Sequence, residues 1–133
     1  MYSPMLHLKS VHHIAIICSD YTKSKDFYTR ILGFEVISEA YRFERDSYKL
    51  DLALGGRYLI ELFSFPNPPQ RVSRPEAAGL RHLAFEVDNL EEAVAHLTAN
   101  GVTSEPIRID EYTGRRFTFF FDPDNLPLEL YEG

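Results

Sequence analysis

The sequence predicts an α+β fold made of two copies of one β-α-β-β-β unit. The run "HHIAIIC" at 12–18 matches "RHLAFEV" at 81–87 position by position, so that His13 corresponds to His82. A stretch with helical spacing and three strand-like runs follow each of them. Neither half is long enough to bury a good core alone, so we expect an internal repeat within one domain.

In the first half, residues 11–17 alternate as a strand, with isoleucines on one face and His13 on the other. Ser19 or Asp20 can cap the helix that follows, and Gly33 can end it. The apolar positions of this helix have helical spacing: Phe27, Tyr28, Ile31 and Leu32. Three more strands are expected over 34–40, 48–54 and 57–63.

Residues 66–80 hold four of the eight prolines, so we interpret them as a connector. Asn89 can then cap a second helix that ends at Gly101. Strands are expected over 102–109, 115–121 and 127–131, with a turn at "DPDN" before the last one. The expected organisation is a single domain over 1–133, with a first module at about 10–65, the connector, and a second module at about 81–132.

The composition is typical of a soluble globular protein with a formal charge of −6. Scattered arginines and lysines form no basic stripe, which argues against nucleic acid as a partner. The longest apolar run is too short to span a bilayer, and no secretory signal is evident. Cys18 is the single cysteine and continues an apolar strand face, so we expect a buried thiol and a reducing, cytoplasmic location.

Two carboxylates stand alone between apolar neighbours, Glu61 in "LIELF" and Glu129 in "PLELY". Glu61 follows His13 by 48 residues, and Glu129 follows His82 by 47. Both pairs are expected on the sheet face that the helices leave uncovered. Imidazole and carboxylate suit a borderline divalent metal, so the sequence predicts that these four residues hold one ion.

Each of these residues also has an ordinary explanation when it is considered singly. A glutamate on the outer face of an antiparallel strand is what alternation predicts, and a strand histidine is often a half-buried packing residue. We expect no role for His12, on the helix side, and expect exposed surface positions for His7 and His96. The recurrence of the pair in both copies favours the metal site.

The chain resembles the vicinal oxygen chelate superfamily and, within it, glyoxalase I (lactoylglutathione lyase). The resemblance runs from about residue 10 to the end, and it rests on "HHIAIICSD", "FYTRILGF", "GLRHLAFEVDNLEEA" and "DPDNLPLEL". It implies two tandem βαβββ modules whose curved mixed sheets surround a metal-binding cup. It also implies a homodimer whose sites are shared between chains or built within one chain.

By this resemblance the metal ligands follow the His-Glu-His-Glu order of glyoxalase I: His13, Glu61, His82 and Glu129. Ni²⁺ or Zn²⁺ are the first candidates, with Co, Mn or Fe as alternatives. A small substrate with vicinal oxygens would isomerise through an enediolate. Glu129 is the first choice as the base, and Glu61 would shuttle the proton or serve the opposite face.

Two positions depart from glyoxalase I, which has an arginine at the place of Ile17 and an asparagine at the place of Phe65. Both contact glutathione in that family, so their replacement argues against glutathione as the substrate. The alternatives are an epimerase or dioxygenase of the same superfamily, or an antibiotic-binding or other small-molecule-binding protein without catalysis. Glu61 argues against the dioxygenase, because related iron enzymes lack a carboxylate at that position.

Overall fold

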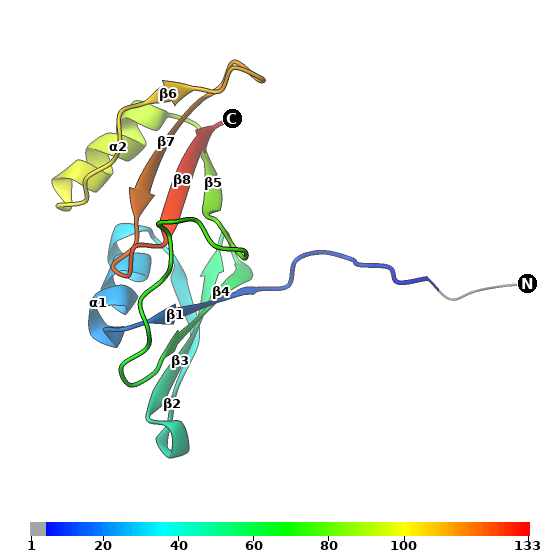
Figure 1. Cartoon of the computed structure of the whole chain (residues 1–133), viewed down its shortest axis with the longest axis vertical. Coiled ribbons are helices and arrows are strands. Elements are labelled where there is room, and N and C mark those ends of the chain that lie inside the picture. Colours follow the sequence, from blue (N-terminus) through cyan, green and yellow to red (C-terminus); the bar gives the residue numbers. More distant parts are fainter. Residues whose placement is uncertain (1–4) are drawn as a thin grey trace, which may run out of the picture. The chain divides into compact units, whose positions relative to one another are not determined.

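The computed structural model describes residues 5–133 and forms two compact units, Met1–Pro68 and Pro69–Gly133. Each unit contains one four-stranded sheet and its own helix (Figure 1). The α+β fold class and the two tandem modules are therefore confirmed. Within the described residues, no helix has the length and apolar character needed to cross a membrane.

The first unit begins with a strand and a helix and continues with three antiparallel strands. Its elements are β1 (Ile14–Cys18), α1 (Tyr21–Asp26), the π-helical turn η1 (Phe27–Ile31), β2 (Glu35–Arg42), the 3₁₀ turn η2 (Phe43–Arg45), β3 (Ser47–Leu54) and β4 (Arg57–Ser64). The order in the sheet is β1-β4-β3-β2. β1 runs parallel to β4, whereas the other neighbours are antiparallel, so the sheet is mixed.

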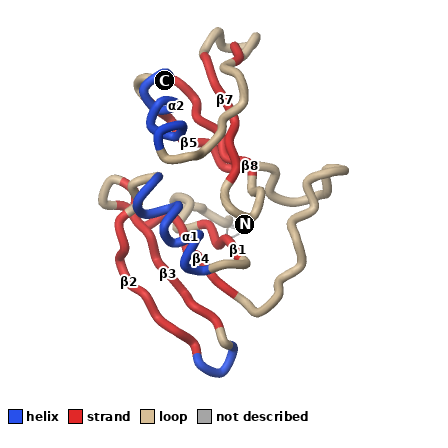
Figure 2. Tube along the Cα trace, turned by 90° about the vertical axis from the view of Figure 1, so that its left-hand side faces the viewer, coloured by secondary structure: helices blue, strands red, loops and turns tan. Residues whose placement is uncertain are grey.

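The second unit repeats this topology. Its elements are β5 (Leu83–Val87), α2 (Leu90–Ala99), β6 (Arg108–Ile109), β7 (Arg116–Phe121) and β8 (Pro127–Glu132). The sheet order is β5-β8-β7-β6, with β5 parallel to β8. Figure 2 shows the two sets of strands, separated in the chain by a long loop.

The helix starts follow the capping residues that the sequence offers. The Asp20 carboxylate accepts a hydrogen bond from the Lys23 backbone N–H at 3.1 Å, and the Asn89 side chain accepts one from the Glu92 N–H at 3.0 Å. Each cap satisfies a backbone donor that has no partner inside the helix. Asn125, in the turn before β8, adopts a φ of 66°, which asparagine tolerates better than most residues.

Alternation along the strands separates a buried face from an open face in each sheet. In the first unit the buried face consists of aliphatic side chains and the thiol: Ile16, Cys18, Leu50, Leu52, Ile60 and Leu62. Each large aliphatic side chain contributes about 1.5–3 kcal/mol when it is fully buried. We call the opposite side, which carries Glu61 in the first unit and Glu129 in the second, the open face.

Three expected elements differ in the structure. The first strand begins at Ile14 rather than at Val11, and the run 102–109 forms only a two-residue ladder at Arg108–Ile109. Pro106 has no N–H to donate, which is one reason that the ladder does not extend further. The first helix continues as a π-helical turn, in which the Leu32 N–H donates to the Phe27 carbonyl at 3.0 Å.

Arg116 on β7 connects the helix and the last strand of the second unit. Its guanidinium lies 2.5 Å from Glu91 on α2 and 2.9 Å from Glu132 on β8. Glu132 also accepts a hydrogen bond from the Leu90 N–H at the start of α2. The hydrogen bonds from Arg116 lower the pKa of Glu91 to about 2 and also lower the pKa of Glu132.

We therefore expect Arg116→Met to lower the melting temperature at neutral pH. A carboxyl whose pKa is depressed on folding contributes stability above its ordinary pKa of 4.5, and the contribution is lost as the pH falls towards about 2. The difference between wild type and variant should therefore shrink between about pH 5 and pH 2 in thermal unfolding. Arg115→Met is the matched control, and an equal loss of stability in that variant would contradict the assignment.

Candidate functional site

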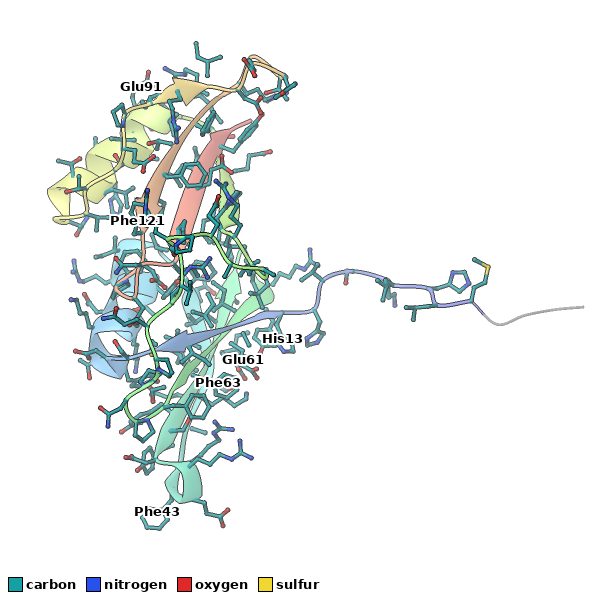
Figure 3. All side chains as sticks on the ribbon, in the orientation of Figure 1. His13, Phe43, Glu61, Phe63, Glu91 and Phe121 are labelled. Carbon is teal, nitrogen blue, oxygen red and sulfur yellow. The ribbon has the colours of Figure 1, made fainter. Side chains whose placement is uncertain are left out.

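The first unit brings His13 and Glu61 together. His13 lies immediately before β1, and Glu61 lies on β4 in register with Ala15. His13 Nε2 is 3.6 Å from Glu61 Oε1, and the Glu61 side chain is only 15% exposed. Figure 3 shows both side chains close together where β1 and β4 begin to pair.

The second unit brings His82 and Glu129 together in the same way. His82 lies immediately before β5, and Glu129 is in register with Ala84, as Glu61 is with Ala15. His82 Nε2 is 3.3 Å from Glu129 Oε1, and the Glu129 side chain is 14% exposed. The two halves thus present the same pair, through the same ring nitrogen, on their open faces.

The spacing within each pair fits one shared ion. Two ligand atoms that are each about 2.1 Å from one ion lie about 3.0–3.4 Å apart at octahedral or tetrahedral angles. The observed separations of 3.3 and 3.6 Å are close to this range and are longer than an ordinary hydrogen bond. The donor set, an imidazole with a largely buried carboxylate, therefore suits a divalent metal.

A pair alone is too few ligands for a stable site. Within residues 5–133, no three His, Cys, Asp or Glu side chains gather as a ready metal site. The quartet of His13, Glu61, His82 and Glu129 thus stays a prediction, of which the structure forms the two halves.

Sequence reasoning missed a charged network beside Glu61. Lys49 on β3 lies 2.9 Å from Asp51 and 3.4 Å from Glu61, and Tyr58 donates a hydrogen bond to Asp51 at 3.1 Å. Burial acts to raise the pKa of Asp51, but the hydrogen bonds that it accepts lower it overall. Alternation in "YKLDLAL" places Lys49 and Asp51 on the open face, and that signal could have found them.

The two carboxylates have different surroundings. The position of Asp51 opposite Glu61 is taken in the second unit by Phe119, which lies opposite Glu129 and packs edge-on against His82. Lys49 partly compensates the charge of Glu61, whereas within the described residues no lysine or arginine forms an ion pair with Glu129. The two glutamates thus differ in that a lysine stands beside Glu61 and, among the described residues, none pairs with Glu129.

The structure places His12 against His13, a contact that its expected position on the helix side did not indicate. His12 Nδ1 lies 2.8 Å from His13 Nδ1, and both rings pack against Tyr58. The strand starts only at Ile14, so alternation does not separate His12 from His13. A hydrogen bond at Nδ1 would fix the His13 ring with its Nε2 turned to Glu61.

The two positions that depart from the glyoxalase I pattern are apolar and line the first unit's open face. Ile17 is 54% exposed on β1. Phe65 follows β4, stacks with Phe63, and lies beneath the Arg42 guanidinium at 5.6 Å from its ring centre. This surface therefore offers aromatic and aliphatic contacts to a ligand.

The fold and the two His–Glu pairs together indicate the class of protein to which this chain belongs. The chain matches the family described as the Glyoxalase/Bleomycin resistance protein/Dioxygenase superfamily over residues 10–130, and it belongs to that superfamily. The membership expected from its motifs is thus confirmed.

Several individual relatives match this chain over nearly its whole length. "Uncharacterized protein YwkD" of Bacillus subtilis is 70% identical, covering 94% of this chain and 98% of its own. "Uncharacterized protein YaeR" of Escherichia coli is 67% identical, covering 96% and 99%. The crystal structure of SMU.1112c superimposes with a TM-score of 0.89 at 51% identity and covers 95% of this chain and 100% of that one.

Enzymes of the superfamily match at lower identity. A lactoylglutathione lyase of Escherichia coli O157:H7 is 31% identical, with 90% of each chain covered. A 2-epi-5-epi-valiolone epimerase of Actinomyces sp. is 30% identical, with 91% of this chain and 78% of its own covered.

Proposed function

We propose that this protein is a divalent-metal-dependent lyase or isomerase of glyoxalase I type, acting on a small substrate with vicinal oxygens. The observation that carries the proposal is the His–Glu pair formed identically in both units. The four residues hold the ion, which when bound supplies Lewis-acid stabilisation of negative charge on adjacent substrate oxygens.

Residues of the chain itself carry out the proton transfer and shape the surroundings of the substrate. Glu129 removes a proton from one substrate carbon and returns it to the neighbouring carbon, because its charge is not compensated by a lysine. Glu61, paired with Lys49, completes the ligand set and relays the proton on the opposite face. Apolar side chains such as Phe119 and Phe63 limit the access of water to the open faces.

The lactoylglutathione lyase relative supports the reaction class, and the epimerase relative supports a second candidate. Epimerisation needs the same removal and return of a proton beside a stabilised oxygen, so Glu129 and Glu61 could act from opposite faces. Ile17 and Phe65 in place of polar glutathione contacts favour a substrate other than the glutathione adduct. We further propose a homodimer in the cytoplasm.

The experiment that tests this function measures metal and turnover on the purified protein. Metal content per chain is determined first, and Ni²⁺, Zn²⁺, Co²⁺ or Mn²⁺ is then added before each assay. The substrates are the methylglyoxal–glutathione hemithioacetal and a panel of α-hydroxy and α-oxo compounds. Metal-dependent exchange of a carbon-bound proton in any of these compounds supports the proposal. Stoichiometric ligand binding without exchange supports a binding protein instead.

His12 should contribute to metal affinity through its contact with His13. We expect His12→Ala to weaken metal binding by about 10-fold or more, the usual cost of losing a group that orients a metal-binding histidine. His12→Gln keeps a side-chain acceptor and should retain part of the affinity. Isothermal titration with Zn²⁺ measures the effect, with His7→Ala as the control. Equal affinity of His12→Ala and wild type would contradict this role.

A further inference from the structure

The second unit contains an open cavity that is lined by its own residues. Its volume is about 540 Å³, and its wall includes His82. The connector supplies one side, from Arg71 to Ala77, and Phe119 and Phe121 of β7 lie on another. Because both Phe119 and Glu129 lie beside His82, the cavity opens next to the second His–Glu pair.

The charge of this cavity is opposite to that of the whole chain. Four arginines line it, Arg71, Arg74, Arg81 and Arg108, against two glutamates, Glu76 and Glu105. Four positive and two negative groups leave a formal excess of +2, in a chain whose formal charge is −6. Such a local concentration of positive charge attracts a small anion.

Two of the four arginines have a carboxylate partner. Arg81 forms an ion pair with Glu76 at 2.5 Å. Arg108 pairs with Glu105 at 3.0 Å and lies over the rings of Phe117 and Phe119. These contacts compensate the charge of both side chains.

The other two arginines keep their charge uncompensated. Arg71 is half-buried and is held by neutral groups, donating to the carbonyls of Leu80 at 2.6 Å and Arg81 at 3.0 Å and to the Ser73 hydroxyl. Arg74 makes no hydrogen bond or ion pair within the described part of the chain. Arg74 is exposed and solvated, whereas the half-buried Arg71 has no counter-charge beside it, and an anion would supply one.

From this arrangement we infer that the substrate carries an oxyanion, a carboxylate or a phosphate, which Arg71 and Arg74 bind in the cavity. Arg71 is anchored through Nε and Nη2, which leaves the hydrogens of Nη1 for the anion, whereas Arg74 is free to close on it. The placement of the vicinal oxygens beside His82 and Glu129 rests on the proposed function, but the binding of the anion does not. Phe119 and Phe121 then contact the short carbon chain between the two ends.

Three probes with the same three-carbon backbone separate the contributions. Glycerate carries a carboxylate, glycerol 3-phosphate carries a phosphate, and glycerol carries only the vicinal hydroxyls. Each is titrated into the metal-free full chain, and chemical shifts are followed by NMR. Either anion should bind about 10-fold or more tightly than glycerol. The tighter of the two anions identifies the carboxylate or the phosphate as the preferred group.

Arg74→Gln is the decisive variant, because Arg74 holds no other part of the structure in place. We expect it to weaken binding of the preferred anion about 10-fold, with Arg115→Gln as the unchanged control. Arg71→Gln should weaken it further, and its melting temperature shows whether the connector remains ordered. Glycerol binding as tightly as the anions, or unchanged binding by Arg74→Gln, would overturn the inference. If the anion binds but the protein takes up no metal, the proposed function fails while this inference stands.

Discussion

Replacing Glu129 by glutamine should abolish turnover while leaving the fold intact. The loss expected for removal of a positioned general base is about 10²–10⁴-fold. Glutamine is isosteric but cannot accept the proton, and its neutral oxygen is a weaker metal ligand. Since losing an orienting partner of a ligand already costs about 10–100-fold in affinity, losing the Glu129 ligand itself should cost at least the upper value.

Two further variants make this prediction specific. Glu86→Gln changes an exposed glutamate of the same sheet, on β5, and should alter neither metal affinity nor turnover. Glu61→Gln should weaken metal binding but retain more turnover than Glu129→Gln at saturating metal, because Lys49 compensates the charge of Glu61. Equal loss in the two ligand variants at saturating metal would show that Glu129 is not the principal base.

The histidine variants should each lose the metal, and mixing them should restore part of it. His13→Ala removes a ligand from the first unit, and His82→Ala removes one from the second. If each site draws one His–Glu pair from each of two chains, a mixed dimer has one intact site and one doubly altered site. With random mixing, half of the dimers are mixed and half of their sites are intact, so about a quarter of wild-type activity should return.

This recovery is measured after the two inactive variants are unfolded and refolded together, with each variant refolded alone as the control. Recovery in the mixture alone supports sites shared between two chains. No recovery, despite mixed dimers shown by mass spectrometry, would mean that all four ligands come from one chain. Metal retained at full affinity by either single variant would contradict the quartet itself.

Much of the fold could be predicted because local rules and the repeat agree. Apolar alternation fixed the buried face of the strands, Asp20 and Asn89 marked the helix starts, and Cys18 is buried as expected. Comparing the two halves also singled out one histidine and one glutamate in each. In the structure His13 lies beside Glu61 and His82 beside Glu129, and the quartet and its metal remain predictions.

Other parts of the site could not be predicted from pattern alone. Alternation gives the face on which Lys49 and Asp51 lie, but it does not show that Lys49 bridges to a glutamate on the next strand. His12 contacts His13 because the strand begins later than its sequence suggests. The connector has no periodicity, so nothing in its residues indicated that Arg71 and Arg74 line a cavity with His82.

The sequence by itself determined the duplicated unit, the strand faces and the recurring histidine and glutamate, because hydrophobic periodicity and capping act between near neighbours in the chain. Only the tertiary structure decided which charges compensate which. Register between strands and the return path of the connector bring Lys49 to Glu61 and leave Glu129 beside Phe119, and these contacts depend on packing between residues far apart in the chain.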